Sequence, residues 1–454
     1  MTNMYSQYYF IGIGGIGMSA IARYFKNRGF AVSGYDRTPS ALTHALEQEG
    51  IGVHYEDDIN AIPKDVAHTF VIYTPAIPAE LGELQYVRNH GYALCKRSKA
   101  LGEIARGQEC LAVSGTHGKT TTSTLLAHIL THSGEGCNAF LGGISKNYGT
   151  NLLLSANKVL VAEADEFDRS FLQLFPDIAV ITATDADHLD IYSDHRHVLE
   201  AFGEFASQVS AEGSLIIKKG VEVPLEKVSA KVYRYSFDKP CDFYADGITP
   251  LEGGYFDFTL VHPAGRIPHC KVGVPGWVNV ENAVAASAVA LLHGVDPGAL
   301  RQALASFSGV KRRFDIHVNT PRCAYIDDYA HHPNEIRAAI GSIRNIFPGR
   351  RICGIFQPHL YTRTRDFAED FADALSGLDE LIMLPIYPAR ELPIEGVCSE
   401  MILDKVKGPE KMLVQKDQLM QTLRSREIDC LVTFGAGDID RFIQPIEDYL
   451  KTIC

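Results

Sequence analysis

CLAVSGTHGKTTT, residues 110–122, joins a short apolar run to a pattern that binds phosphate. The run CLAVSG is typical of a buried strand, and apolar residues recur at helical spacing after the threonines. The spacing G-x-x-G-K-T is shorter than the usual G-x-x-x-x-G-K-[ST], because Val113 stands where the first glycine would be. We predict an ATP site in which N–H groups around Gly118 and the Lys119 ammonium hold phosphates, and the Thr120 hydroxyl binds Mg²⁺. The alternative is a chance Gly-Lys-Thr sequence on a surface turn.

Similar apolar runs recur along the chain, and each is followed by a turn and a helical pattern. They are YYFIGIG (8–14), HTFVIYT (68–74), KVLVAEAD (158–165), DIAVITAT (177–184), RRICGIFQP (350–358), ELIMLPIY (380–387) and CLVTFGAGD (430–438). Strands that alternate with helices predict an α/β fold whose ligand loops lie at the carboxyl ends of parallel strands.

We expect three domains. They are a Rossmann-like domain over residues 1–107, a central P-loop domain over 108–309 and a Rossmann-like domain over 310–454. Between about 213 and 272, the segments YRYSF, FYADGI and YFDFTLVH alternate in polarity, as antiparallel strands do. The central domain is therefore expected to carry an antiparallel β appendage.

The first apolar run opens a glycine loop, YFIGIGGIGMSAIARYF. It has G-x-G-x-x-G at Gly12, Gly14 and Gly17, with Gly15 between them, and Asp36 follows where a ribose-binding carboxylate would lie. Glycines let the backbone approach a diphosphate at a helix N-terminus. The loop alone fits NAD, the diphosphate of another nucleotide, or a turn that only packs helix on strand.

Two further strand ends supply candidate metal ligands beside the phosphate loop. These acidic and histidine residues are Glu163, Asp165, Glu166, Asp168, Asp185, Asp187, His188 and Asp190. A zinc site at His188, His195 and His197 is the alternative, although these residues lack tight i,i+4 spacing and cysteine partners. For most of these carboxylates, the expected role is a solvated loop.

Composition bounds the class of protein. A net charge of −12 over 454 residues argues against broad nucleic-acid or anionic-membrane binding. The ten cysteines contain no C-x-x-C pair, so we expect a reduced, cytoplasmic protein without disulfides. The first basic residue is Arg23, and no apolar stretch is long enough for a membrane span, so neither a secretory signal nor membrane insertion is expected.

The motifs GIGGIGMS, GTHGKTTT, EADE, DADHLD, VKRRFD, DDYAHHP and FQPHLYTRT together resemble the Mur ligases, from Gly12 to Gly437. The resemblance implies that the first domain holds a UDP-sugar, the second binds ATP with Mg²⁺, and the third brings an amino acid. Within that family, the resemblance is greatest to the members that join L-alanine to the carboxylate of UDP-N-acetylmuramate. These enzymes act through an acyl phosphate, in peptidoglycan precursor synthesis.

The resemblance also implies roles for residues that match the motifs. The UDP-sugar is expected at Gly12, Gly14, Gly15, Gly17 and Asp36. The ATP phosphates are expected at Gly115, Thr116, His117, Gly118, Lys119, Thr120 and Thr121, and Mg²⁺ at Thr120, Glu163 and His188. The rest of the nucleotide is expected at Asn279, Asn282, Arg313 and Asp328, and the substrate and amino acid at Tyr329, His331, His359 and Arg363. Lys119, Asp328, His331 and Arg363 are the expected catalytic residues.

Several positions depart from the family pattern. Val278 replaces a usual histidine, for which Trp277 is the candidate substitute, and Ala183 replaces an asparagine. Leu360 replaces a frequent arginine, and Phe167 a common serine. These departures concern base and substrate contacts and leave Lys119, Thr120, Glu163 and His188 unchanged.

Three other functions remain open. One is a recycling ligase that joins a tripeptide to UDP-N-acetylmuramate, which shares the GTHGKT loop. Another is an NAD-dependent oxidoreductase built on GIGGIG, which leaves SGTHGKTTT unexplained. The third is a non-catalytic nucleotide sensor, which leaves DDYAHHP unexplained.

Overall fold

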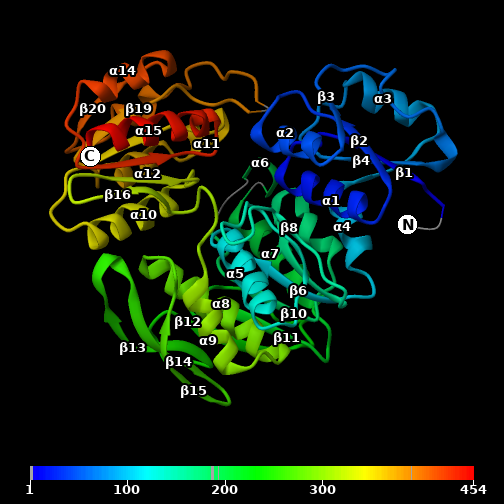
Figure 1. Ribbon diagram of the computed structural model, residues 1–454, viewed down its shortest axis with the longest axis horizontal. Helices are drawn as coiled ribbons and strands as arrows, with labels where there is room; N and C mark the ends of the chain where they lie inside the picture. Colours follow the sequence, from blue (N-terminus) through cyan, green and yellow to red (C-terminus); the bar gives the residue numbers. More distant parts are fainter. Residues whose placement is uncertain (1–3, 186–188, 193, 390) are drawn as a thin grey trace. The chain divides into compact units, whose positions relative to one another are not determined.

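The computed structural model describes residues 4–185, 189–192, 194–389 and 391–454. In these residues the strands form sheets of five, ten and six strands (Figure 1). The contacts divide the chain into two compact units: residues 1–247, 258–270 and 281–307 make one, and residues 248–257, 271–280 and 308–454 make the other. The mixed α/β architecture with three sheets confirms the predicted fold class. The boundaries at 107/108 and 309/310 stay a prediction.

The first sheet is parallel throughout and has the order β3-β2-β1-β4-β5. Its strands are β1 (Gln7–Ile11), β2 (Ala31–Tyr35), β3 (Gly52–His54), β4 (Thr69–Tyr73) and β5 (Ala93–Lys96), and its helices α1 (Ile16–Asn27), α2 (Ala41–Gln48), α3 (Gly82–Asn89) and α4 (Arg97–Ala105). Successive side chains of β1 enter opposite cores: Tyr8 and Phe10 pack with Phe25 on one face, and Tyr9 and Ile11 lie in the other. Burial on both faces explains why this strand is an uninterrupted apolar run.

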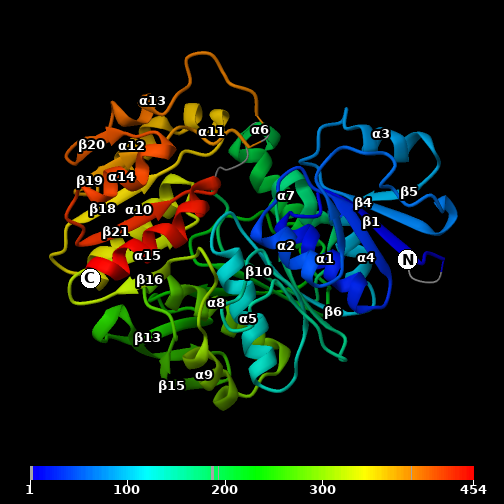
Figure 2. The same ribbon diagram turned by 45° about the horizontal axis from the view of Figure 1, so that its top comes forward.

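The second sheet has the order β15-β14-β13-β12-β11-β10-β6-β9-β7-β8. Its strands are β6 (Glu109–Ser114), β7 (Asn138–Phe140), β8 (Leu152–Leu153), β9 (Val159–Ala164), β10 (Ile178–Ile181), β11 (Ser214–Lys218), β12 (Lys231–Ser236), β13 (Phe243–Pro250), β14 (Phe256–His262) and β15 (Gly265–Lys271). The helices are α5 (Lys119–His132), α6 (Leu189–Tyr192), α7 (His195–Ser207), α8 (Trp277–His293) and α9 (Pro297–Ser306), with a 3₁₀ segment η2 (Phe167–Gln173). Strand β6 pairs in parallel with β9 and β10, so three predicted ligand-bearing strand ends are neighbours. Helix α5 packs on β6 and β9 (Figure 2).

The expected antiparallel appendage is wrong in part. YRYSF lies in β12, which pairs in parallel with β11, and FYADGI begins β13, which pairs in parallel with β12. These strands extend the central sheet. In β13, residues 243–246 alternate between buried and partly buried positions, a pattern that the sequence cannot distinguish from antiparallel pairing, whereas residues 232–234 of β12 are all partly buried. Strands β14 and β15 are joined by two residues and β13 and β14 by five, so both neighbouring pairs have the short connection of an antiparallel hairpin.

The third sheet has the order β16-β17-β21-β18-β19-β20. Its strands are β16 (Asp315–Asn319), β17 (Ala324–Asp328), β18 (Ile352–Phe356), β19 (Glu380–Met383), β20 (Glu410–Leu413) and β21 (Cys430–Phe434). The helices are α10 (Pro333–Ile346), α11 (Tyr361–Asp366), α12 (Ala368–Leu375), α13 (Glu400–Leu403), α14 (Leu419–Arg424) and α15 (Ile443–Ile453). Only the edge strand β16 is antiparallel to its neighbour. Ile352 and Phe356 of β18 join the core under α10 and α12, whereas Ile355 joins the core under α14 and α15.

One pair of cysteines contradicts the expectation of a fully reduced chain. Cys323 and Cys454 form a disulfide with their Cα atoms 6.0 Å apart. They are 131 residues apart in sequence, so no local spacing could reveal them. The other eight cysteines are free. Among the described residues, no helix has the length and apolar character needed to cross a bilayer.

Candidate active site

The phosphate loop runs from the end of β6 to the start of α5. Gly115 (φ 132°) and Gly118 (φ 79°) have backbone conformations that favour glycine. A Cβ on Gly115 would also overlap Thr182. The N–H of Thr116 donates to Ala183 O at 3.0 Å, which fixes the loop to the end of β10. Gly118 is the N-cap of α5, so the N-terminal turn of this helix begins at the loop, as in anion sites at helix N-termini.

The Lys119 ammonium lies at the centre of this loop. Its Nζ atom donates to the Gly115 carbonyl at 2.6 Å and to both carboxylate oxygens of Glu166 at 2.7 and 2.9 Å. Burial opposes its charge, but the attraction of Glu166, with Asp165 and Glu163, outweighs burial and raises the pKa of Lys119 above its usual value. Lys119 is therefore a charged group held ready inside the loop.

Glu163, on β9, faces the first turn of α5. Its Oε1 atom accepts from the Thr120 hydroxyl at 2.9 Å, and its Oε2 atom from Gly142 N at 3.0 Å and Ser123 Oγ at 3.4 Å. A carboxylate beside a hydroxyl is an oxygen donor set of the kind that Mg²⁺ prefers. The third predicted ligand, His188, lies outside the described residues. The described part of the chain holds no cluster of three His, Cys, Asp or Glu side chains placed to bind a metal.

The end of β10 also contacts the loop. The Nε2 atom of His117 pairs with Asp185 Oδ2 at 3.1 Å, and Asp185 N donates to Thr116 Oγ1 at 3.1 Å. These contacts do not support the alternative zinc site. The His195 ring contacts the carbonyl of Thr184, and His197 pairs with Asp194, the N-cap residue of its own helix. Thr121, in the first turn of α5, is partly buried.

The two predicted base-side asparagines lie one turn apart on α8. Asn282 reaches the phosphate loop: its Oδ1 atom accepts from Thr122 at 3.3 Å and lies 2.9 Å from where a Cβ on Gly118 would be. Asn279 instead donates to Pro275 O at 2.6 Å. Of the two, Asn282 is thus the one that the fold brings to the loop.

The glycine loop of the first sheet is closed by Asp36. The Oδ2 atom of Asp36 accepts from Gly14 N at 2.8 Å, and its Oδ1 atom from Thr38 N at 3.1 Å. A Cβ on Gly14 would lie 2.8 Å from the same carboxylate. Asp36 therefore holds the loop, in addition to any ribose contact. Gly12 has φ 87°, whereas Gly15 has room for a side chain and caps α1.

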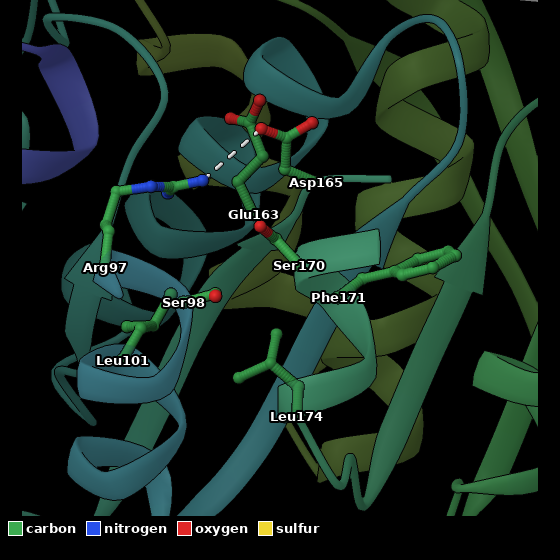
Figure 3. Close-up of a pocket in the computed structure, with 8 residues that line it drawn as sticks. All are labelled: Arg97, Ser98, Leu101, Glu163, Asp165, Ser170, Phe171 and Leu174. Carbon is green, nitrogen blue, oxygen red and sulfur yellow. Dashed lines mark hydrogen bonds and ion pairs between the residues drawn. The ribbon is translucent and has the colours of Figure 1, made fainter. Parts of the chain in front are cut away.

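A pocket beside this loop is lined from both α/β sheets of the first unit (Figure 3). Arg97 and Ser98 begin α4, Glu163 lies near the end of β9, Asp165 follows that strand, and Ser170 lies in η2. Arg97 points toward the carboxylates and pairs with Asp165 at 3.5 Å (Figure 3). Sequence reasoning missed Arg97 and Gly142, because their partners are remote in the chain. It named Glu166 only among the acidic candidates.

The carboxyl end of β17 carries Asp328 and Tyr329. The Arg313 guanidinium lies 4.7 Å from the centre of the Tyr329 ring. Asp328 accepts from Ala330 N at 3.0 Å, and burial raises its pKa to about 7, with Arg313 opposing the shift. The neighbouring Arg312 is bound to Asp327 and to the carbonyl of Gly435, so it holds the strand ends together.

The remaining predicted residues gather at the same sheet edge. The ring centres of His331 and His359 are 5.9 Å apart, and the His359 ring stacks on Tyr387 at 5.9 Å. His332 caps α10 together with Glu335. Two further features are a buried Arg363 on α11 and an unusual positive φ of 70° at Leu360, immediately before that helix.

Three family profiles cover nearly the entire chain. The profile described as "Mur ligase family, catalytic domain" matches residues 7–109, "Mur ligase middle domain" matches 113–290, and "Mur ligase, glutamate ligase domain" matches 312–437. The chain therefore belongs to the Mur ligase family.

Its relatives within the family include enzymes of one named kind. The chain is 52% identical to a UDP-N-acetylmuramate--L-alanine ligase of Porphyromonas gingivalis, over 98% of this chain and 99% of that protein. It is 51% identical to the same ligase of Parabacteroides distasonis, over 99% and 98%. Among solved structures, the UDP-N-acetylmuramate-alanine ligase MurC of Thermotoga maritima matches with a TM-score of 0.83 and 28% identity, over 98% of this chain and 99% of that chain. A murein peptide ligase of Psychrobacter arcticus shares the fold, with a TM-score of 0.73 at 21% identity and 98% of each chain covered.

Proposed function

We propose that this chain is an ATP-dependent ligase that joins L-alanine to the carboxylate of UDP-N-acetylmuramate. The observation that carries the proposal is that contacts link two nucleotide-type loops in one compact unit: Arg97 lies beside Gly17 and pairs with Asp165, and Glu163 accepts from Thr120. The names of the relatives at about half identity supply the substrates. An oxidoreductase would leave the Lys119 loop without a role.

ATP makes a leaving group. A carboxylate oxygen of the muramate attacks the γ-phosphorus, the bond to the bridging oxygen breaks, and ADP leaves. The product is an acyl phosphate. The amine of L-alanine then attacks the acyl carbon, inorganic phosphate leaves, and the amine gives up a proton. Such phosphoryl transfer depends on positioning and charge neutralisation.

Residues of the first unit act on the first step. The N–H groups at the start of α5 and the Lys119 ammonium bind the phosphates and offset their charge. Thr120, Glu163 and His188 would hold Mg²⁺, which neutralises phosphate charge when bound. Gly12, Gly14, Gly15 and Gly17 bind the diphosphate of the UDP-sugar, in a loop that Asp36 keeps closed.

Residues of the second unit act mainly on the second step. Arg363 binds the alanine carboxylate through paired N–H groups, and His331, His359 and Tyr329 line the position of the incoming amine. We assign Arg313 and Asp328 to nucleotide binding. The substrates are small molecules. Because the reaction consumes ATP, we expect it to take place in the cytoplasm.

The deciding experiment is a phosphate-release assay with UDP-N-acetylmuramate, Mg²⁺-ATP and one amino acid at a time. Release should require both substrates and be fastest with L-alanine. Oxygen-18 in the muramate carboxylate should appear in the phosphate. Faster turnover with the tripeptide L-alanyl-γ-D-glutamyl-diaminopimelate would assign the recycling reaction instead, and release without an amino acid acceptor would rule out a ligase.

A further inference from the structure

Arg97 occupies a position between the two nucleotide loops. It is the first residue of α4 and follows β5, so it lies at the carboxyl edge of the first sheet, where the glycine loop also lies. Helix α4 also packs on the central domain, where a Cβ on Gly102 would lie 2.5 Å from the carbonyl of Gln173. The backbone that carries Arg97 is thus fixed on both sides.

Gly17 shows where the guanidinium lies. A Cβ built on Gly17 would be 2.8 Å from Arg97 Nη1 and 3.2 Å from its Cδ atom. Gly17 lies in the first turn of α1 and has no left-handed φ, so the backbone alone does not require glycine there. Arg97 fills the space that a side chain at Gly17 would take, so a side chain there would displace the guanidinium. This places a positive charge at the helix end that attracts anions.

The hydrogen-bonding capacity of Arg97 is largely unused. A guanidinium has five N–H donors. Within the described part of the chain, the polar partner of Arg97 is Asp165, at 3.5 Å, although its side chain is only 19% exposed. Arg23, by contrast, binds Glu49 through two nitrogens and Asn151 through the third. Arg23 is a structural arginine, whereas Arg97 retains donors for an anion.

We propose that Arg97 binds the diphosphate of the UDP-sugar, and that its ion pair with Asp165 aligns that substrate with the strand end that carries Glu163. The inference rests on the proposed function and deepens it. The glycine loop supplies N–H groups to one side of the diphosphate, and Arg97 supplies a charged pair of donors to the other. Arg97 acts here as a binding residue.

The test measures binding by calorimetry, without turnover, to the full-length parent and to Arg97→Gln, Arg97→Lys and Lys96→Gln. The probes are UDP-N-acetylmuramate, UDP-N-acetylglucosamine, which has the diphosphate but no lactyl carboxylate, and ADP. Lys96→Gln is the matched control, because Lys96 pairs with Asp168 at 2.8 Å in the same crossing between domains but is half exposed.

Arg97→Gln should weaken both UDP-sugars by about tenfold or more, as expected for lost charged hydrogen bonds, and leave ADP unchanged. Arg97→Lys should fall between, and Lys96→Gln should match the parent. Unchanged binding of both UDP-sugars by Arg97→Gln would overturn the inference, as would a loss confined to UDP-N-acetylmuramate, which would assign Arg97 to the carboxylate. A parent chain that binds neither UDP-sugar would overturn the proposed function itself.

Gly17→Ala tests the same contact without removing Arg97, and it applies even if Arg97→Gln does not fold. The new methyl group displaces the guanidinium, so both UDP-sugars should bind more weakly while ADP binds normally. Combined with Arg97→Gln, the Gly17 change should add little, because the two substitutions remove one interaction. Full additivity, or normal UDP-sugar binding by Gly17→Ala, would contradict the proposal.

Discussion

The Lys119–Glu166 pair couples stability to phosphate chemistry. Glu166 is 1% exposed and contacts the Lys119 ammonium through both oxygens. Removing one member of such a pair leaves a buried charge without compensation, which typically costs about 3 kcal/mol or more. A loss of activity in a Lys119 variant therefore mixes two effects, a folding effect and a chemical one.

The double variant separates them. Lys119→Ala should lower the thermal unfolding temperature and abolish acyl phosphate formation, a loss of about 4 kcal/mol in transition-state stabilisation. Adding Glu166→Gln should restore most of the stability and none of the activity. The acyl phosphate is trapped by borohydride reduction with alanine omitted. Restored activity in the double variant would show that Lys119 only balances Glu166.

Asp328 should make stability depend on pH. A free aspartate ionises near pH 3.8, whereas burial raises the pKa of Asp328 to about 7. Between these values the folded state binds more protons than the unfolded state, so rising pH destabilises the fold, and above about pH 7 the full cost persists. The cost is about 4 kcal/mol at most, from roughly three pKa units at 1.36 kcal/mol each.

Asp328→Asn removes this titration. Denaturant unfolding at several pH values should show the variant gaining stability relative to the parent between pH 4 and 7, then holding that difference. Asp373→Asn, which changes a carboxylate that is 76% exposed, should show little trend. A pH-independent difference for Asp328→Asn would mean that its carboxyl is ionised throughout.

At the scale of elements, the loop after β7 positions the carboxylate of Glu163, one of the proposed Mg²⁺ ligands. Gly142 N donates to Glu163 Oε2 at 3.0 Å, and a Cβ on Gly142 would overlap the same carboxylate. The sequence gives no sign of this, because Gly142 and Glu163 are 21 residues apart. The loop after β7 and the end of β9 therefore act together to position Glu163.

Gly142→Ala should displace Glu163 and raise the Mg²⁺ concentration that gives half-maximal rate, by about tenfold if one oxygen contact is lost. The KM for alanine should change little. Gly341→Ala is the control, since a Cβ there meets open space on α10. If kinetics at varied Mg²⁺ gave the same half-maximal Mg²⁺ concentration for Gly142→Ala and Gly341→Ala, the role of Gly142 in positioning Glu163 would be contradicted.

The elements also show where local patterns mislead. The apolar runs that became β1, β4, β6, β9, β10, β18, β19 and β21 were predictable, because strands buried on both faces need continuous apolar side chains. The parallel direction of β12 and β13 was not predictable from the sequence. Strand direction depends on the path of the connection between strands, and side-chain alternation does not reveal that path. The helix cap at His332 had a local signal, the Glu335 three residues later.

At the scale of the whole molecule, the Cys323–Cys454 disulfide ties the end of the chain to the residue before β17. It closes a loop of 131 residues, for which chain entropy gives up to about 5 kcal/mol of stabilisation. Without reductant, the unfolded protein should titrate eight thiols, and after reduction ten. Cys454→Ser should unfold at a lower temperature than the oxidised parent and match the reduced parent. Ten thiols without reductant would contradict the bond.

The sequence by itself determined the α/β class, the phosphate loop and the residue types of the site. These depend on neighbours: Gly118, Lys119 and Thr120 need only a strand before them and a helix after them to form an anion site. Family membership followed from the same short motifs.

Only the tertiary structure decided which of these residues meet. Glu166 reaches Lys119 across 47 residues, Asp36 reaches Gly14 across 22, and Arg97 fills the space that Gly17 leaves open. Such contacts arise because parallel strands bring their carboxyl ends to one edge, whatever their order in the chain. The order of adjacent residues in the sequence specifies the phosphate loop, whereas packing at the sheet edge decides which distant side chains contact it.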